Sequence, residues 1–380
     1  MPHPTPEQQA ILTPDTNIIV SGATGLIGAE LIRSWCELSR GGKGRLWALV
    51  RERQGISPAE RLRQRLRRTP SAAAALSHAE ALCGDMTQAN WGLSDADLRR
   101  VTQSVDMIIH NAADTSFVAR RTTYDTNVSG TRELIALARK CSRNPLIVFM
   151  STAANSGEVK DRILTEDDGC RPHNTHVNDY THSKAVAEQM LRDSGLPVLI
   201  LRPTIVLPAA RGDPELAKQI LWFAPITSRF RALPIDPASR VDATDVDFVV
   251  NATLGLLQKR HRAWQAYNLS AGLRHAVTTE RVFAVIDRCY QRERPLRLVA
   301  PDRWTAWHRE TFVRSPLQKK LFGALAHYFP FLNQNVVHDD TRLRHELGEA
   351  APRVRPVLEG LPSLLALIPD RVAMREAARP

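Results

Sequence analysis

Short apolar runs and amphipathic segments alternate along the first half of the chain. Short apolar runs predict buried strands, and apolar residues that recur every three or four positions predict helices. Strands that alternate with helices pair in parallel, because a parallel connection needs a crossover. The sequence therefore predicts an α/β fold, a Rossmann-type doubly wound parallel sheet with its ligand site beyond the carboxyl ends of the strands. The predicted strands cover residues 17–22, 45–50, 79–85, 105–113, 145–152 and 197–206, and the predicted helices cover 26–39, 58–69, 95–101, 127–141 and 180–195.

The alternation breaks near Leu207, and helical patterns then dominate. We expect a smaller, mostly helical C-terminal subdomain that folds over the ligand edge of the sheet and binds the substrate. The Pro-rich, polar residues 1–16 predict a flexible N-terminal arm. Residues 17–206 are assigned to an NADP-binding Rossmann domain and residues 207–380 to the substrate-binding part, from which 241–273 return to the Rossmann core. The later helical patterns cover 214–230, 241–258, 303–312, 315–329 and 341–348, with one more strand at 266–270.

A glycine-rich turn, SGATGLIG, joins the first predicted strand to the first helix. Gly22 permits the tight turn, Gly25 lets the backbone approach a pyrophosphate, and Gly28 lets the helix pack close to the sheet. In this position the turn predicts a dinucleotide site, although its spacing differs by one residue from the G-x-G-x-x-G fingerprint. Thr24, Leu26 and Ile27 belong to the same cradle.

Further cofactor contacts are expected where the third and fourth strands end. Asp85 and Met86 close the third strand, where Asp85 either meets an adenine amino group or serves as a turn residue. Asn111, Ala112 and Ala113 follow the fourth strand, and the two alanines leave room for a nucleotide. Asn127 either supports that strand from the following helix or caps the helix.

Tyr180 and Lys184 lie four residues apart, and therefore on one face of a predicted helix. A reductase needs a proton donor for the oxygen that becomes anionic during hydride transfer. A tyrosine serves if a nearby ammonium lowers its pKa. Ser151 and Thr152 end the preceding strand, and alternation lets only one of them face the ligand edge. We expect Thr152 to be that residue.

Arg51 ends the second predicted strand, where the adenosine ribose of a dinucleotide would lie. A guanidinium there can bind a 2′-phosphate with two hydrogen bonds, whereas an acidic residue would bind the free hydroxyl of NAD. The sequence therefore favours NADPH. Arg61 either adds a second contact or, as is more common, lies on a solvated helix face, and the role of Arg53 stays open.

The composition of the chain bears on its partners and its location rather than on its fold. The formal net charge of +11 favours acidic or phosphorylated partners. The basic residues are spread along the chain and form no nucleic-acid-binding module, so no nucleic-acid partner is expected. Five widely spaced cysteines predict neither a metal site nor disulfides. With no secretory signal and no apolar run long enough for stable membrane insertion, a cytoplasmic protein is the simplest interpretation.

The motifs resemble the extended short-chain dehydrogenase/reductase superfamily, and within it the fatty acyl-CoA reductase and thioester reductase branch, the male sterility type of NAD(P)-binding domain. The likeness covers roughly residues 18–273, with a fainter echo at FPFLNQNVVHDDTRLRHELG. It rests on GATGLIG, LVRERQGISPAERL, GDMTQANWGLSDADL, VDMIIHNAADTSF, NVSGT, STA, YTHSKAVAEQ, LRPTIV and VDATDVDFVVNA.

The resemblance implies roles for matching residues. Thr152 and Tyr180 would stabilise an oxyanion, Lys184 would tune Tyr180 and bind the ribose, and Pro203 to Ile205 would contact the nicotinamide. In the branch, an arginine at the position of Arg51 goes with NADPH. STAANSG lacks the Tyr-Cys pair of eukaryotic alcohol-forming members, and their membrane-anchored C-terminal domain is not recognisable.

Three functions follow from these features. The first is NADPH-dependent reduction of an acyl thioester, carried by coenzyme A or by an acyl or peptidyl carrier protein, to an aldehyde or, with a second hydride, to an alcohol; the sequence leaves the final product open. The second is a ketone or aldehyde reductase, or a nucleotide-sugar epimerase or dehydratase, of the same fold. A non-catalytic NADP sensor ranks last, because the Tyr/Lys pair is intact. The sequence leaves the oligomeric state open.

Aromatic residues in the C-terminal half either line an acyl tunnel or form the packing core of the helices, and the second alternative is the more common. The candidates are Trp222, Phe223, Phe230, Trp304, Trp307 and Phe312.

Overall fold

The computed structural model describes residues 12–67, 78–117, 120–209, 214–259 and 264–368. Its centre is a parallel sheet with the strand order β12-β7-β5-β4-β1-β2-β3. The order reverses between β1 and β4, which places a ligand crevice at their carboxyl ends. The predicted Rossmann-type fold is confirmed. The strands are β1 Ile18–Ser21, β2 Leu46–Val50, β3 Ala79–Cys83, β4 Met107–His110, β5 Leu146–Met150, β7 Val198–Pro203 and β12 Trp264–Leu269.

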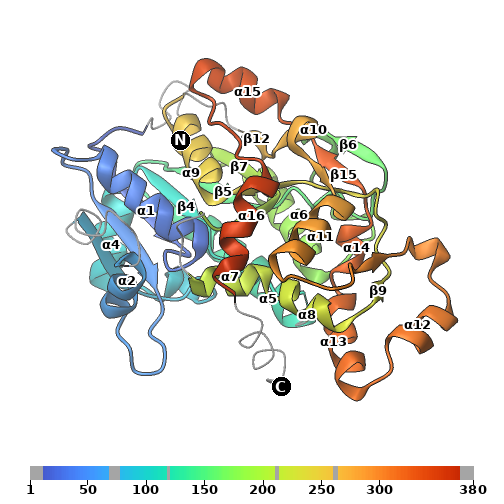
Figure 1. Cartoon of the computed structure of the whole chain (residues 1–380). Helices are drawn as coiled ribbons and strands as arrows, with labels where there is room; N and C mark the ends of the chain where they lie inside the picture. Colours follow the sequence, from blue (N-terminus) through green and yellow to red (C-terminus); the bar gives the residue numbers. More distant parts are fainter. Residues whose placement is uncertain (1–11, 68–77, 118–119, 210–213, 260–263, 369–380) are drawn as a thin grey trace.

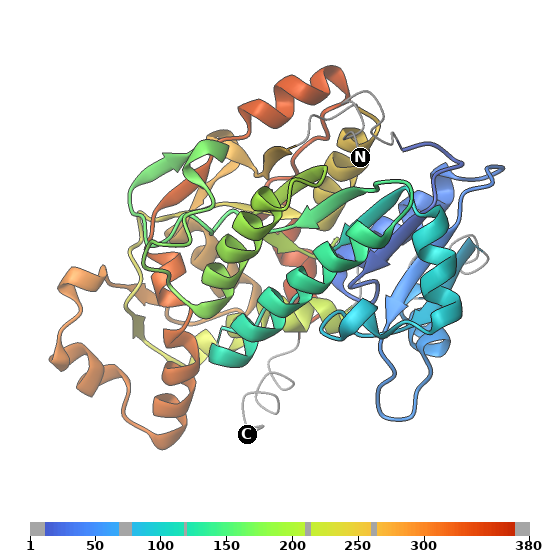
Figure 2. The same ribbon diagram turned by 180° about the vertical axis from the view of Figure 1, so that it is seen from behind.

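Helices cover both faces of this sheet, because its strands are apolar on both sides. In β1, Ile18 and Val20 pack on one face and Ile19 on the other. Figure 1 shows α1 and α9 over the first face, and Figure 2, from behind, shows α5 and α6 across the second. The flanking helices are α1 Leu26–Leu38, α2 Pro58–Leu66, α4 Asp95–Ser104, α5 Arg120–Lys140, α6 Asp179–Asp193, α9 Val246–Leu257 and α15 Thr341–Leu347, with the 3₁₀ turn η2 Ala89–Gly92 beside them.

The predicted strand 197–206 is divided in the structure. β7 ends at Pro203, and β8 Ile205–Leu207 pairs instead with β11 Ala243–Asp245 in a separate two-stranded sheet. Proline has no N–H to donate to a ladder, so the strand ends there. Asp245 then caps α9, because its side chain accepts a hydrogen bond from the Phe248 N–H.

The C-terminal part has its own apolar core, to which Leu221, Phe230, Ile286, Leu325 and Leu361 contribute. Its helices and 3₁₀ turns are α7 Pro214–Leu221, α8 Phe223–Ile226, η4 Thr227–Arg229, α10 Gly272–His275, α11 Thr279–Cys289, η5 Pro301–Arg303, α12 Ala306–Phe312, α13 Pro316–Ala326, α14 Phe329–Leu332, η6 Gly348–Ala350 and α16 Val357–Ala366. Its short strands are β9 Ala232–Leu233, β10 Arg240–Val241, β13 Val277–Thr278 and β14 Arg297–Leu298.

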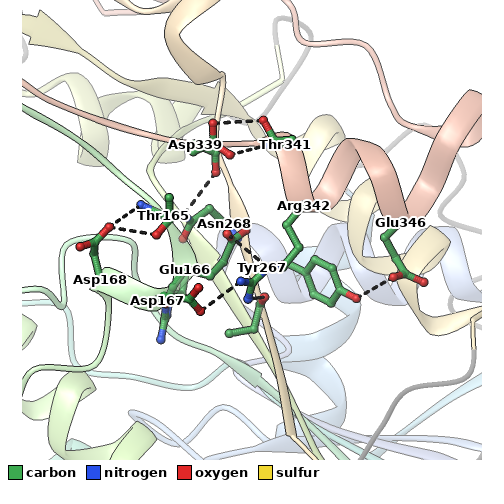
Figure 3. A network of polar contacts seen from close by, with 12 residues as sticks. Thr165, Glu166, Asp167, Asp168, Tyr267, Asn268, Asp339, Thr341, Arg342 and Glu346 are labelled. Atoms are coloured by element: carbon green, nitrogen blue, oxygen red, sulfur yellow. Dashed lines mark hydrogen bonds and ion pairs between the residues drawn. The ribbon is translucent and has the colours of Figure 1, made fainter.

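Two three-residue strands that the sequence analysis does not predict join the halves of the chain. β6 Arg162–Leu164 pairs in parallel with β15 Val336–His338. The 3₁₀ turn η3 Glu166–Asp168 follows β6. There, Arg342 of α15 contacts the carboxylates of Glu166 (3.6 Å) and Asp167 (3.0 Å) (Figure 3). These contacts fix the C-terminal segment against the end of the sheet.

Part of the expected N-terminal arm is held against the body. Leu12 is buried, and its N–H donates to the Leu257 carbonyl of α9 (2.8 Å). The carbonyl of Pro14 accepts from the Gly44 N–H. Residues 12–16 are therefore packed rather than free, because an apolar side chain and backbone groups anchor them. Residues 1–11 lie outside the described residues.

Candidate active site

The glycine turn lies between β1 and α1 in close backbone contact with the end of β4. A Cβ atom on Gly22 would lie 2.7 Å from the Ala112 nitrogen, and one on Gly28 would lie 2.2 Å from the Gly22 carbonyl oxygen. Gly22 also has a φ of +70°, a region that favours glycine. A Cβ on Gly25 would meet only the Gly22 oxygen (3.2 Å) and the Asn111 amide nitrogen (4.0 Å) within 4 Å among the described atoms. The Gly25 side of the turn is therefore the more open one.

The N-terminus of α1 fits an anion. No side chain caps it, and its first turn, which includes Leu26, Ile27 and Gly28, carries no acidic residue. The first N–H groups of a helix lack intrahelical partners, and the helix dipole favours negative charge there. Thr24 contributes its carbonyl to a hydrogen bond from Arg65 of α2 (3.2 Å), which ties the turn to that helix. These residues suit a dinucleotide pyrophosphate.

The ends of β1 and β4 are joined by hydrogen bonds. The Ser21 hydroxyl lies 3.0 Å from Nδ1 of His110 and accepts from the Ala112 N–H (3.2 Å). The Asn111 amide donates to the Gly22 carbonyl (3.3 Å). Burial, together with the charge of Lys184, lowers the pKa of His110 to about 3, so His110 is neutral. Asn111 therefore supports the glycine turn, Ala112 packs against it, and Ala113 is partly exposed next to them.

Arg51, Arg61 and Asp85 lie together where β2 and β3 end. Arg61 of α2 donates to the main-chain carbonyl of Arg51, and Arg51 Nη1 lies 3.5 Å from an Asp85 carboxylate oxygen. The Arg51 side chain remains 68% exposed. Burial and the charges of Arg53 and Arg51 lower the pKa of Arg61. Three neighbouring cations with one carboxylate form a site that attracts an anion.

Asp85 is held as a turn residue. One of its carboxylate oxygens accepts hydrogen bonds from the N–H and hydroxyl of Thr87 (2.9 and 2.8 Å). Burial raises the pKa of Asp85, but these hydrogen bonds and the charge of Arg51 outweigh burial and lower it overall. The carboxylate is ionised at neutral pH. The neighbouring Met86 packs against α5, where a Cβ on Gly130 would lie 3.1 Å from its sulfur.

The side chain of Thr152 lies close enough to the Tyr180 hydroxyl to lower the pKa of that phenol. The Thr152 hydroxyl also accepts from the Ala154 N–H (3.3 Å). The Ser151 hydroxyl is buried and has no hydrogen-bond partner among the described residues. Of the two hydroxyls, Thr152 is the one beside Tyr180, and successive side chains of an extended segment point in opposite directions.

Lys184 lies on the same face of α6 as Tyr180, but its ammonium is bound elsewhere. Its Nζ donates to the Met150 carbonyl (2.6 Å) and lies 4.3 Å from the centroid of the Phe149 ring. Burial lowers the pKa of Lys184 to about 7, although Glu188 raises it. Burial raises the pKa of Tyr180 to about 12, although the hydrogen bond with Thr152 lowers it.

The expectation that Lys184 lowers the pKa of Tyr180 is therefore wrong for this state of the chain. Both groups are desolvated, and the ammonium is directed to the Met150 carbonyl rather than to the phenol. Tyr180 is a protonated phenol at neutral pH, which is the form that can donate a proton.

Asn127 supports the site from within α5 rather than capping that helix. Its side chain accepts from the Asp114 N–H (2.8 Å) and donates to the Asp114 carbonyl and to the Ser183 hydroxyl (both 2.9 Å). It therefore ties the segment after β4 to the helix that carries Tyr180. The pattern NVSGT contains this residue, but sequence spacing alone does not show its partners.

Pro203 and Ile205 lie at the end of the sheet beside β5. The Pro203 carbonyl accepts from the Ala153 N–H (2.9 Å), so the strand after Thr152 and the end of β7 remain paired. The Ile205 side chain is 45% exposed. The structure thus brings the predicted nicotinamide contacts to the edge where Thr152 lies.

The predicted aromatic candidates divide into two groups. Phe230 is buried in the C-terminal core against Phe322, and Trp304 stacks on Phe322 as well. Phe223 packs against the same core, whereas Trp307 and Phe312 contact each other in and beside α12. Trp222 alone reaches toward the candidate site, through an edge contact with Tyr328 (5.5 Å between ring centroids).

The rings nearest Tyr180 are ones that the sequence analysis does not single out. Phe117 lies 6.0 Å from the Tyr180 ring, centroid to centroid, and contacts Tyr328 and Phe331. Phe117 and Phe331 occur in the motifs VDMIIHNAADTSF and FPFLNQNVV, which is the one signal that could have found them.

No group of three or more His, Cys, Asp or Glu side chains that could hold a metal ion occurs among the described residues. Within the same part of the chain, no helix combines the length and apolarity needed to cross a membrane.

Comparison with known proteins identifies the chain's relatives. A Drosophila melanogaster protein provisionally named fatty acyl-CoA reductase CG8303 is 26% identical over 277 residues, which cover 63% of this chain and 51% of that protein. The carboxylic acid reductase of Mycobacterium tuberculosis is 29% identical over 212 residues, which cover 50% of this chain and 18% of that enzyme. The chain thus spans about half the length of the first relative and a smaller part of the second.

Solved structures show the same fold. The terminal reductase domain of the myxalamid biosynthetic pathway superposes with a TM-score of 0.76 at 24% identity, covering 96% of this chain and 94% of that one. UDP-glucuronic acid 4-epimerase from Bacillus cereus shares the fold at a TM-score of 0.64 and 16% identity, covering 93% and 99%.

The family model described as "Male sterility protein" matches residues 20–253. This match includes the glycine turn, the arginine cluster and the Thr152–Tyr180 pair. The chain therefore belongs to the male sterility protein family of NAD(P)-binding oxidoreductases, together with fatty acyl-CoA reductases and the terminal reductase domains of peptide and polyketide synthetases.

Proposed function

We propose that the chain is an NADPH-dependent reductase of acyl thioesters, with Thr152, Tyr180 and Lys184 as its catalytic residues. One observation carries the proposal: the neighbouring side chains of Thr152 and Tyr180 lie at the same edge of the sheet as the glycine turn. A nicotinamide cofactor held at that edge would supply the hydride.

Thr152 and Tyr180 would act on the substrate carbonyl oxygen. Both hydroxyls can donate hydrogen bonds to one acceptor, and such donors stabilise negative charge as it develops on that oxygen. Because burial keeps Tyr180 protonated, it can also transfer its proton to the oxygen. The resulting hemithioacetal would collapse to an aldehyde and release the thiol, and a second reduction would give the alcohol.

Lys184 is close to its protonation midpoint at neutral pH. Its Nζ is already fixed by the Met150 carbonyl at the end of β5. From there the ammonium would hold the ribose hydroxyls of the cofactor.

The arginine cluster supports NADPH over NADH. Arg51 is largely exposed and only weakly paired with Asp85, so its guanidinium is available to a 2′-phosphate. Arg61 already orders the Arg51 backbone. The cofactor contacts proposed on this basis are those of the glycine turn, Arg51, Arg61, Asp85, Met86 and the segment from Asn111 to Ala113, together with Tyr180, Lys184, Pro203 and Ile205.

The cysteines favour direct reduction over a covalent acyl-enzyme. Burial raises the pKa of Cys36, Cys141 and Cys170 to about 12, so these thiols are protonated and poorly nucleophilic. Cys83 and Cys289 are exposed but lie outside the motifs that form the candidate site.

The donor is proposed to be coenzyme A or a carrier protein. Relatives include carrier-linked synthetases, and both donors present acidic groups that suit a chain with net charge +11. An epimerase is the second candidate, since an epimerase structure shares the fold. Epimerases of this kind recycle bound NAD, and Arg51 opposes that cofactor.

Purified chain incubated with NADPH and acyl thioesters tests the proposal. Thioester-dependent NADPH oxidation with release of free thiol is expected. Activity on ketones alone, or tightly bound NAD that survives purification, would favour the second candidate.

A further inference from the structure

The carboxylate of Glu188 is the centre of a buried polar network next to the candidate catalytic residues. Glu188 follows Lys184 by four residues, so their side chains lie on one face of α6, one turn apart. The Glu188 side chain is 0% exposed. One of its oxygens accepts from Arg202 Nη2 of β7 (2.6 Å), and the other accepts from Arg202 Nε (3.1 Å) and from the Asn155 amide (2.5 Å). Protein groups rather than solvent therefore hold this charge in place.

Asn155 joins the segment that carries Thr152 to α6. It lies three residues after Thr152, and it is fully buried. Its amide donates to Glu188, and its side-chain oxygen accepts from the Cys170 N–H (3.2 Å). Because α6 also carries Tyr180, this bridge fixes the segment of Thr152 relative to the phenol.

Glu188 is also the counter-charge of the buried Lys184. Burial lowers the pKa of Lys184, and of the charged side chains that the structure describes, Glu188 is the one whose charge raises it again. The titratable groups that face Lys184 from β4 and from its own helix, His110 and Tyr180, are neutral at pH 7. β5 presents a main-chain carbonyl and an aromatic ring to the ammonium. A buried ammonium is costly without an opposite charge, so the charge of Lys184 depends on Glu188.

From this arrangement we infer that Asn155 and Glu188 are positioning residues of the site: Asn155 fixes Thr152 beside Tyr180, and Glu188 keeps Lys184 charged. The inference rests on the proposed function, in which Thr152, Tyr180 and Lys184 act on the substrate and the cofactor. Asn155 and Glu188 are both fully buried, so they act through the three residues that face the ligands.

The role of Glu188 is tested in the cofactor-free chain, by the free energy of unfolding that Lys184→Met adds at different pH values. Below the folded pKa of Lys184 this gain is constant, because the folded and unfolded chains then bind the same number of protons. In the otherwise wild-type chain, the gain should stop growing near pH 7 as the pH falls from 10. Without the Glu188 charge the folded pKa is lower, so this limit should move down by about one pH unit. Urea unfolding from pH 5 to pH 10 measures the limit.

Two backgrounds remove the charge of Glu188. Glu188→Gln keeps the shape of the side chain but leaves Arg202 unpaired. Glu188→Gln with Arg202→Met leaves neither charge of this pair buried alone, so it keeps the test decisive if the single variant does not fold. Asp287→Asn is the matched control, because Asp287 forms a similarly buried ion pair with Arg292 in the C-terminal part (2.5 Å). A limit near pH 7 in every background, or an equal shift in Asp287→Asn, would overturn the role of Glu188.

The role of Asn155 is tested by steady-state kinetics of thioester reduction. Asn155→Ala should lower kcat by at least about tenfold, because Thr152 is then no longer held beside Tyr180. In a chain that already carries Thr152→Val, the same change should lower kcat by less than about twofold, since residues that act through one another are not additive. A general loss of folded chain would lower kcat by the same factor in both cases.

Asn174→Ala is the matched control for Asn155. Asn174 donates to the Ser156 carbonyl (2.8 Å), one residue further along the same segment, rather than to α6. It should leave kcat within about twofold of the wild type. An unchanged kcat in Asn155→Ala, or equal fractional losses with and without Thr152→Val, would overturn the role of Asn155.

Failure of the proposed function has a different signature. The wild-type chain would then oxidise no NADPH with any thioester, whereas the pH limit measured by unfolding would still move when the charge of Glu188 is removed.

Discussion

The side chain of Thr152, just after β5, lies beside the hydroxyl of Tyr180 on α6 and lowers the pKa of that phenol. The neighbouring Ser151 hydroxyl is buried and does not take part. Two proton-bearing oxygens are thus placed where they can bind one substrate oxygen. Most of the expected behaviour of the site follows from this pair and from the charges around it.

Thr152→Val should lower kcat for thioester reduction by about 10²- to 10³-fold, because it removes one donor to the developing oxyanion and keeps the shape of the side chain. Steady-state kinetics at saturating NADPH would measure this. Ser151→Ala is the matched control and should change kcat by less than about threefold. A larger loss in Ser151→Ala than in Thr152→Val would mean that Ser151 is the donor.

Arg51→Ala should raise the Michaelis constant for NADPH by about ten- to a hundredfold, since a hydrogen-bonded charge pair with the 2′-phosphate is lost. The constant for NADH should change by less than about twofold. Arg63→Ala provides a control on α2, because Arg63 pairs with Glu60 instead of joining the Arg51 cluster. Equal effects of Arg51→Ala on the Michaelis constants for NADPH and NADH would show that Arg51 does not bind the 2′-phosphate and is a solvated surface residue.

Lys184→Met should raise the free energy of unfolding of the cofactor-free chain above that of the wild type. The increase should be larger at lower pH. The folded pKa of Lys184 is lowered from 10.5 to about 7, so the unfolded chain binds more protons between these values and wild-type stability rises with pH there. The advantage of Lys184→Met should therefore shrink by up to about 1.4 kcal/mol per pH unit from pH 7 to pH 10. Urea unfolding at pH 6, 8 and 10 measures it. If the difference in free energy of unfolding between Lys184→Met and the wild type does not depend on pH, the pKa of Lys184 is not lowered in the folded chain.

Glu188→Gln should destabilise the fold by about 3–5 kcal/mol, because it leaves the Arg202 guanidinium buried without its counter-charge. The two side chains are 0% and 1% exposed, and their charged atoms are 2.6 Å apart. Asp125→Asn is the control, since its pair with Arg121 is 62% and 94% exposed, and it should cause no measurable change in the urea midpoint. If neither variant changes the free energy of unfolding, the buried ion pair between Glu188 and Arg202 is contradicted.

Local sequence rules predict the parts of the site that depend on local geometry. The glycine turn follows from an apolar strand, three glycines and a helix. The shared face of Tyr180 and Lys184 follows from a spacing of four residues. The main sheet follows from the same reasoning, because most of its strands are short apolar runs that alternate with helical patterns.

The features of the fold and of the candidate site that local sequence rules do not predict depend on contacts between residues far apart in the sequence. The Met150 carbonyl captures the Lys184 ammonium, which no spacing in the sequence indicates. β6 and β15 are three residues each and pair across more than half the described chain, so neither has a pattern long enough to detect. Phe117 and Phe331 lie far apart in the sequence and meet where Asn333 holds α14 against the β9–β10 connection.

The measurement that tests the central claim most directly is product analysis after incubation with NADPH and a medium-chain acyl thioester. Wild-type chain should release one free thiol for each thioester reduced, with NADPH consumed in proportion to the aldehyde and alcohol formed, and Tyr180→Phe should lose this activity by at least about a hundredfold. Thiol release without NADPH oxidation, or NADPH oxidation that does not depend on Tyr180, would contradict the account.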